Sequence, residues 1–228
     1  MESKRKITKK NIPLTLILHT YRIKIMRIVI KQDSPSDRII KRIVQTLKDG
    51  GVIVYPTDTI YGIGCDIFNK EGIERIYKIK RRWKNKPLSF ICADLSNISQ
   101  YAIVPNYAYR IMKRCLPGPY TFILEASSLT PRKILGKRKT VGIRLPNHKL
   151  CLSMVKELGH PIISTSANIS EEEELNTPDD IEDKLGHSLD LIIDGGPLIS
   201  TPSTIIDLTG DSPIVIREGK GDIDKVTG

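Results

Sequence analysis

The stretch SDRIIKRIVQTLKDGGVIVYP, residues 36–56, contains both patterns from which the fold of this 228-residue chain is predicted. Its first half predicts a helix that is capped by Ser36 and ends at Gly50 and Gly51. The apolar residues on one face of this helix are Ile39, Ile40, Ile43, Val44 and Leu47. The run VIVYP that follows predicts a buried strand, which Pro56 ends. A one-sided helix beside an apolar strand is typical of an α/β sheet.

The same alternation of apolar runs and helical patterns continues along the chain. We expect strands at 26–30, 52–56, 87–93, 121–126, 141–146, 161–167, 189–196, 203–209 and 213–218. We expect helices within 36–51, 69–82, 106–116, 149–159 and 177–186. This interleaving predicts one α/β domain with helices packed on an open sheet. The strands at 203–208 and 213–218 are joined by the tight turn GDSP, so the sheet should be mixed rather than purely parallel.

Composition indicates a globular protein with an anionic partner. The chain is 39% hydrophobic, and its 36 basic and 26 acidic residues give a net charge of +10. Aromatic residues make up 5%, which argues against a binder of single-stranded nucleic acid built on stacked bases. No apolar stretch approaches the ~20 residues of a membrane span.

The four cysteines point to a reducing compartment. They are Cys65, Cys92, Cys115 and Cys151. They lack CxxC spacing and lie in apolar segments, so we expect buried thiols in a cytoplasmic protein rather than a disulfide framework or a zinc site.

The first 25 residues differ from the rest of the chain. They carry seven basic residues against Glu2 alone, so +6 of the net charge of +10 lies here. These basic residues are Lys4, Arg5, Lys6, Lys9, Lys10, Arg22 and Lys24. The apolar run Ile12–Leu18 is short, and no small-residue cleavage site follows it, so a signal peptide is not indicated. We expect residues 1–25 to be a basic extension and residues 26–228 to be the folded domain.

Three polar clusters are candidates for a site, because ligands of α/β proteins bind at strand ends. PTDTIYGIG, residues 56–64, follows a buried strand, and its glycines would let the backbone approach a ligand. STSAN, residues 164–168, offers hydroxyls and an amide. KIKRRWKNKP, residues 78–87, holds six basic residues and no acidic one. Each cluster also has a structural interpretation, as a turn, a helix cap or cations that balance a helix dipole.

The basic cluster is the most informative of the three. Six positive charges exceed what a helix C-terminus needs, so an anionic ligand is favoured. Arg82 offers a planar fork and Lys80 a compact point charge, and a nucleotide triphosphate would use both. Arg144 in the apolar stretch VGIRLP needs a partner for its charge, whereas His148 is more often structural than catalytic.

Several other chemistries are excluded by motif. The sequence contains no GxxxxGK[ST] loop and no GxGxxG after a strand, so neither a P-loop nor a dinucleotide-binding fold is indicated. It contains no HExxH, no clustered His and Cys, and no GxSxG elbow.

The clusters, in their order along the chain, resemble the YrdC/YciO family of threonylcarbamoyl-AMP synthases. The stretches that carry the resemblance are GGVIVYPTDTIYGIGCD (50–66), KIKRRWKNKPLSF (78–90), LPGPYTFIL (116–124), VGIRLPNH (141–148), PIISTSANIS (161–170) and STIIDLTGDSPIVIREGKG (203–221). Within the family, RKTVGIR and the final stretch are most similar to the YciO branch.

The resemblance implies a fold, a reaction and partners. The fold is a twisted open mixed sheet with a concave basic surface. In the reaction, L-threonine and bicarbonate form a carbamate, which attacks the α-phosphorus of ATP to give threonylcarbamoyl-AMP and pyrophosphate. Mg²⁺ would accompany ATP without a fixed protein site. A partner transferase would then modify an adenosine of tRNA in the cytoplasm, with no membrane involved.

The resemblance also assigns residues. Lys80 and Arg82 of K-x-R, with Ser166 and Asn168 of S-x-N, would be catalytic. The residues expected at ATP are Lys80, Arg82, Lys86, Thr121, Arg144, Asn168, Ser203 and Arg217. The residues expected at threonine are Thr59, Tyr61, Gly142 and Ser166.

The sequence departs from the family pattern at four places. Trp83 stands for a proline, Lys86 for an asparagine and Ile91 for a histidine, and ISEEEE (169–174) stands where Ser-Gly is expected. We interpret Glu171–Glu174 as a solvated loop that points away from the phosphates or helps to hold Mg²⁺. The alternative is a protein of the same fold that binds double-stranded RNA or tRNA with little or no catalysis. Its basic residues would be those at 78–86, in the N-terminal extension and at 132–139.

Overall fold

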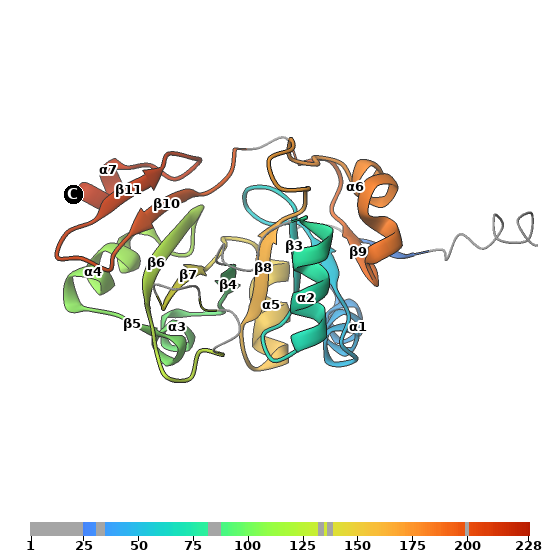
Figure 1. Ribbon diagram of the computed structural model, residues 1–228, viewed down its shortest axis with the longest axis horizontal. Helices are drawn as coiled ribbons and strands as arrows, with labels where there is room; N and C mark the ends of the chain where they lie inside the picture. Colours follow the sequence, from blue (N-terminus) through green and yellow to red (C-terminus); the bar gives the residue numbers. More distant parts are fainter. Residues whose placement is uncertain (1–24, 31–34, 82–87, 132–134, 136–138, 199–200) are drawn as a thin grey trace, which may run out of the picture.

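The computed structural model describes residues 25–30, 35–81, 88–131, 135, 139–198 and 201–228, and one mixed sheet runs through them (Figure 1). The strands are β1 (Met26–Val29), β2 (Ile53–Tyr55), β3 (Gly62–Asp66), β4 (Ser89–Ile91), β5 (Ala102–Ile103), β6 (Tyr120–Ala126), β7 (Thr140–Arg144), β8 (Ile162–Ser166), β9 (Leu191–Asp194), β10 (Thr204–Asp207) and β11 (Ile214–Arg217). Their spatial order is β1-β9-β2-β3-β8-β4-β7-β6-β10-β11, with β5 paired to β6. The pair β10–β11 is antiparallel and β6–β10 is parallel, which confirms the mixed sheet.

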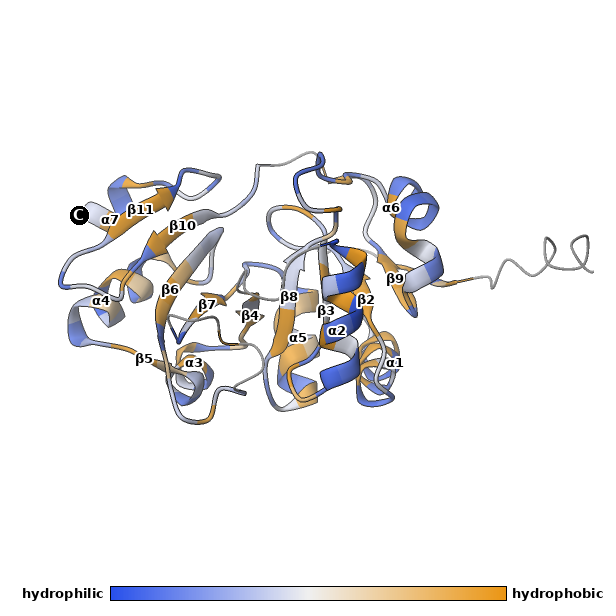
Figure 2. Cartoon of the chain, viewed as in Figure 1, coloured by the Kyte–Doolittle hydropathy of each residue, from blue (hydrophilic) through white to orange (hydrophobic). Residues whose placement is uncertain are grey.

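Helices cover both faces of this sheet. They are α1 (Asp37–Lys48), α2 (Lys70–Ile79), α3 (Leu95–Tyr101), α4 (Asn106–Cys115), α5 (Lys149–Leu158), α6 (Pro178–Leu185) and α7 (Asp224–Thr227), with a 3₁₀ turn, η2 (Gly186–Ser188). The apolar sides of α1 and α5 pack into one core, and those of α2, α3, α4, α6 and α7 pack into the other. Figure 2 shows apolar residues concentrated on the strands and α5, whereas the visible side of α2 is hydrophilic.

The opening stretch of the sequence forms both of its predicted elements. Ile40, Ile43, Val44 and Leu47 of α1 are buried, as the helical pattern predicts. Along 52–55 the side chains alternate between the two cores, with Val52 and Val54 in one and Ile53 and Tyr55 in the other. The strand is apolar throughout because both of its faces are covered.

Four short helices and strands were not predicted, besides the 3₁₀ turn η2. The segment 62–66, where no strand was predicted, is the strand β3, and its glycines make room for neighbouring side chains. The strand β5 has two residues and α7 has four, too few for a periodic pattern. The helix α3 is mostly polar and begins where the Asp94 carboxylate accepts a hydrogen bond from Asn97 N. The basic extension 1–24 lies outside the described residues.

All four cysteines are buried and unpaired, as predicted. No helix in the described ranges is long and apolar enough to cross a membrane. Burial raises the pKa of the Cys65, Cys92 and Cys151 thiols well above their ordinary value. These thiols therefore stay protonated in the folded chain at mildly alkaline pH.

The free energy of unfolding should consequently fall as pH rises above about 8.5, the ordinary thiol pKa. Above that pH the unfolded chain releases thiol protons that the folded chain retains, so each such group lowers stability by up to about 1.4 kcal/mol per pH unit. Urea denaturation at pH 7.5, 9 and 10 measures this slope, and Cys92→Ala should make it shallower. A free energy of unfolding that stays constant over this range would contradict the prediction.

Candidate active site

A hollow forms on the face of the sheet that α5 covers. It lies where the residues on this face change from isoleucine to serine and glycine. Ile162 of β8 and Ile91 of β4 are paired in register and pack into the α1–α5 core. The next pair on the same face of these two antiparallel strands is Ser164 of β8 with Ser89 of β4. Gly64 of β3 pairs with Ser164, so this row contains little side-chain volume above the sheet.

The row continues onto β7, where Gly142 pairs with Ser89. We call Gly64, Ser164, Ser89 and Gly142 the small-residue row. A Cβ added to Gly142 would lie 2.8 Å from Ser89 Oγ and 3.4 Å from Thr121 Cγ2. Gly142, expected at threonine, is not among the residues that line the hollow, but it leaves room for Ser89 and Thr121, which do line it.

Tyr55 explains the glycines of β3. Its hydroxyl donates a 2.6 Å hydrogen bond to Ser164 Oγ, and its ring would be 3.0 Å from a Cβ on Gly62 and 3.2 Å from one on Gly64. Gly64 is doubly constrained, because its added Cβ would also lie 2.3 Å from the carbonyl oxygen of Ile163. These glycines therefore make room for the Tyr55 ring. Gly62 also lines the hollow, whereas Gly64 does not, and the approach of a ligand to the backbone of Gly62 stays a prediction.

The hollow is a cavity of about 210 Å³, which we call the floor cavity. Six residues predicted for the site line it: Tyr61, Thr121, Arg144, Ser166, Ser203 and Arg217. They come from separate strands and loops that the sheet brings together. Arg82 and Lys86, also predicted, lie outside the described residues.

Lys80 joins the K-x-R and S-x-N segments at the edge of this cavity. Its Nζ donates to the Ser166 carbonyl oxygen at 2.8 Å, to Ser166 Oγ at 3.2 Å and to Asn168 Oδ1 at 2.5 Å. Ser166 Oγ also donates to Asn168 Oδ1 at 2.7 Å. The Lys80 residue is 2% exposed, and these three acceptors are neutral oxygens. The arrangement links the end of α2 to the end of β8.

Arg144 has the partner that its place in an apolar strand requires. Its Nη2 donates to Asp58 Oδ1 at 3.1 Å and to Thr59 Oγ1 at 2.9 Å. Its Nε is buried and has no acceptor among the described residues. Thr59, predicted at threonine, does not line the floor cavity and instead positions this guanidinium.

The far wall comes from β6, β10 and β11. Thr121 Oγ1 and Ser203 Oγ are 2.8 Å apart, and Arg217 Nη2 donates to the Ser203 carbonyl oxygen at 2.8 Å. Burial lowers the pKa of Arg217, and nearby Glu174 opposes that shift. The guanidinium remains a cation at neutral pH and is aligned beside two hydroxyls.

Tyr61 lines the cavity, but its hydroxyl is bonded elsewhere. The hydroxyl oxygen accepts from Gly195 N at 3.0 Å and donates to the Gly196 carbonyl oxygen at 2.7 Å. Burial raises the pKa of Tyr61 to about 12. Tyr61 therefore contributes shape to the cavity wall rather than a free hydroxyl.

Sequence reasoning missed part of the lining. Ser89 belongs to a segment interpreted only as a buried strand. Ser164 belongs to the STSAN cluster but received no role of its own, and the period-two alternation IxSxS at 162–166 is the signal that could have placed it beside Ser166 on one face. The interpretation of Glu171–Glu174 as a solvated loop is correct for the first three residues, which are exposed, and wrong for Glu174. Glu174 is half-buried and is the one carboxylate among the described lining residues.

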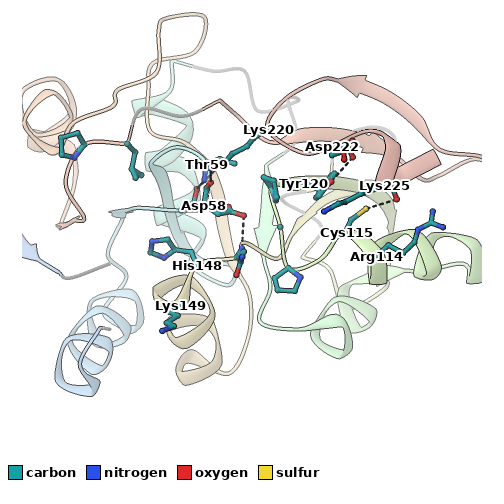
Figure 3. A pocket seen from close by; sticks show the side chains of 17 residues that line it. Asp58, Thr59, Arg114, Cys115, Tyr120, His148, Lys149, Lys220, Asp222 and Lys225 are labelled. Atoms are coloured by element: carbon teal, nitrogen blue, oxygen red, sulfur yellow. Dashed lines mark hydrogen bonds between the residues drawn. The ribbon is translucent and has the colours of Figure 1, made fainter. Parts of the chain in front are cut away.

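A larger cavity of about 910 Å³ follows the loop 57–59, and we call it the loop cavity (Figure 3). Its charged lining residues are Arg114, Lys149, Lys220, Lys225, Asp58 and Asp222. Lys220 Nζ donates to the Asp58 carbonyl oxygen at 2.6 Å. The bonds from Arg144 to Asp58 and Thr59 lie between the two cavities, since Arg144 lines one and its partners line the other.

The fold and the site define a member of a recognised enzyme-containing family. The Sua5/YciO/YrdC family model, described as "Telomere recombination", matches residues 45–219. The uncharacterised protein YciO of Escherichia coli is 43% identical over 196 residues, which cover 85% of this chain and 95% of YciO. Its crystal structure aligns with a TM-score of 0.85 at 42% identity, over 89% of this chain and 99% of that one. This chain belongs to the Sua5/YciO/YrdC family.

Two further relatives carry an activity or a ligand in their names. The threonylcarbamoyl-AMP synthase of Vibrio vulnificus is 35% identical over 159 residues, which cover 68% of this chain and 86% of that protein. The crystal structure of P. abyssi Sua5 complexed with L-threonine aligns with a TM-score of 0.81 at 29% identity. That alignment covers 89% of this chain and 59% of the Sua5 chain.

Gly64→Ala should destabilise the protein by about 1–3 kcal/mol, because the new methyl group meets a backbone carbonyl that cannot rotate away. Gly210→Ala is the matched control, since a Cβ there meets no atom within 4 Å. Its effect should stay within about 0.5 kcal/mol. Urea denaturation of both variants measures the difference, and equal stabilities would contradict the packing described here.

Proposed function

We propose that this protein is an L-threonylcarbamoyladenylate synthase, which makes threonylcarbamoyl-AMP and pyrophosphate from ATP, L-threonine and bicarbonate. The observation that carries the proposal is the convergence of Lys80 and Asn168 on Ser166, which lines the floor cavity together with Arg144 and Arg217. The product would pass to a transferase that modifies tRNA.

This arrangement supports adenylyl transfer. The threonine amine and bicarbonate give a carbamate and water. A carbamate oxygen then bonds to the α-phosphorus of ATP, while the bond from that phosphorus to the pyrophosphate oxygen breaks. Negative charge develops on phosphate oxygens, so catalysis needs fixed cations and alignment and no protein nucleophile. Lys80, Arg144 and Arg217 would supply that charge, together with Arg82 and Lys86.

The hydroxyl groups in the floor cavity suit the binding of L-threonine. Ser166 and Thr121 line the floor cavity together with Ser89 and Ser164, and Thr121 contacts Ser203. Such groups orient a small polar amino acid without adding charge. The Sua5 structure with L-threonine supports threonine as this amino acid, since it shares the fold.

Mg²⁺ would arrive with ATP rather than occupy a fixed site. No cluster of three or more His, Cys, Asp or Glu side chains that could hold a metal occurs among the described residues. Glu174 provides one carboxylate in the lining of the floor cavity. One carboxylate together with substrate phosphates is a usual environment for Mg²⁺ in proteins. The ion would neutralise phosphate charge.

The second candidate is a protein that binds double-stranded RNA or tRNA and has little or no catalysis. The loop cavity favours it, because Arg114, Lys149, Lys220 and Lys225 converge there from different elements. Most of the other basic residues expected at RNA, at 1–24, 82–87, 132–134 and 136–138, lie outside the described residues.

Lys80→Ala should lower threonine-dependent pyrophosphate release by at least about 100-fold, because the fixed charge beside the phosphates is lost. The assay contains ATP, L-threonine, bicarbonate and Mg²⁺, and omitting threonine gives the background rate. Lys156→Ala removes an exposed lysine from the last turn of α5 and should leave the rate unchanged. Thermal melting of both variants separates loss of catalysis from loss of fold.

Absence of threonine-dependent pyrophosphate release by the wild-type protein would exclude the synthase and favour the RNA candidate. In that case tRNA should bind, and its affinity should fall by roughly a decade or more between low and physiological salt if several phosphates are contacted. Filter binding at a series of salt concentrations provides that measurement.

A further inference from the structure

A third cavity lies between the C-terminal end of α2 and the α6–η2 segment, and we call it the α2–α6 cavity. Its volume is about 340 Å³, and three apolar side chains line part of it: Ile79, Ile169 and Leu185. The basic residues that line it are Arg75, Lys78, Arg81, Lys184 and His187. No acidic residue is among its lining in the part of the chain that the structure describes.

Part of this positive charge has no counterpart. Arg75 pairs with Asp190 at 2.8 Å, and Lys184 lies 3.7 Å from Glu172. Lys78 and Arg81 are exposed, and within the described ranges neither side chain forms a hydrogen bond or an ion pair. Like charges that face one small volume repel each other, and an anion between them removes that repulsion.

The α2–α6 cavity and the floor cavity share their connecting segments. Lys80 bonds to the S-x-N motif, whereas the next residue, Arg81, lines the α2–α6 cavity. Likewise Asn168 bonds Lys80, and the next residue, Ile169, lines the α2–α6 cavity. The Ser170 amide donates to the Lys80 carbonyl oxygen at 3.1 Å, which fastens the two segments together.

Glu172 adds a second connection. Asn168 Nδ2 donates to the Glu172 carbonyl oxygen at 2.7 Å, and the Glu172 carboxylate faces Lys184 of the α2–α6 cavity. An anion that attracts Lys184 competes with this carboxylate, so its binding alters the segment that orients Asn168.

We propose that the α2–α6 cavity binds a small molecule with a phosphate group and an apolar or planar part, such as a nucleoside monophosphate, and that this occupant changes turnover in the floor cavity. The volume lies within the range of small-molecule sites, about 300–1,000 Å³. The cations and apolar side chains of the α2–α6 cavity match such a molecule better than an RNA backbone, which needs charges along an extended surface. Binding is independent of the proposed function, whereas the effect on turnover rests on it.

Two substitutions remove the uncompensated charge with little risk to the fold. Lys78→Ala truncates an exposed helical side chain. Arg81 has φ 48°, a left-handed backbone conformation that glycine adopts without strain, so Arg81→Gly removes the guanidinium and suits the backbone. Lys70→Ala, an exposed lysine in the first turn of the same helix and outside the cavity lining, is the matched control.

The test is calorimetry with AMP on an Arg217→Ala background, because Arg217 lines the floor cavity and not the α2–α6 cavity. AMP should still bind this protein, adding Lys78→Ala and Arg81→Gly should lower its affinity at least tenfold, and adding Lys70→Ala should leave it unchanged. Loss of all AMP binding on the Arg217→Ala background, or affinity that survives the paired substitutions, overturns the proposal. The proposal is also overturned if AMP does not bind and duplex RNA binds with an affinity that depends on Lys78 and Arg81. If the wild-type protein lacks synthase activity, the AMP-binding result still stands. Failure of the proposed function and failure of the α2–α6 binding proposal can therefore be told apart.

Discussion

The buried ammonium of Lys80 must be solvated by protein atoms, because a charge removed from water without polar partners is strongly destabilising. Its acceptors include Ser166 and Asn168, which are distant in sequence and lie at and just beyond the end of β8. The end of α2 and the end of β8 are therefore held at one fixed separation. The walls of both the floor cavity and the α2–α6 cavity follow from this separation, since residues next to Lys80 and Asn168 line the latter.

The sheet itself supplies the second constraint. On one face of the sheet, isoleucines of β4 and β8 pack beneath α5. Two residues away on the same face, serines and a glycine replace them and leave space above the sheet. The same strands thus provide a close-packed core and, two residues away, the floor of a cavity. Arg144 and Arg217 border that cavity and are fixed by Asp58 and by the Ser203 carbonyl oxygen. Cations held in this way need little reorganisation when a charged ligand binds.

The elements that the sequence predicts well are those whose burial follows a period. The five buried faces of α1, α2, α4, α5 and α6 and the continuous apolar strand at 52–55 are of this kind. The strand β3 was missed because glycine is an unfavourable strand residue, and only the three-dimensional position of Tyr55 explains why it is needed. Glu174 was misread because a run of four like charges usually faces solvent, whereas the turn after Asn168 carries its last member to the cavity. The meeting of K-x-R with S-x-N was expected from resemblance, since no local pattern links residues so far apart.

The small-residue row also limits how the floor cavity of this chain can change. Ser89 and Ser164 line the cavity, so a larger side chain at either position reduces its volume. Gly64 and Gly142 cannot accept a larger side chain unless their neighbours shift, because an added Cβ would lie 2.3 Å from the Ile163 carbonyl oxygen and 2.8 Å from Ser89 Oγ. A larger cavity has to come instead from the loops and from the β6–β10 wall.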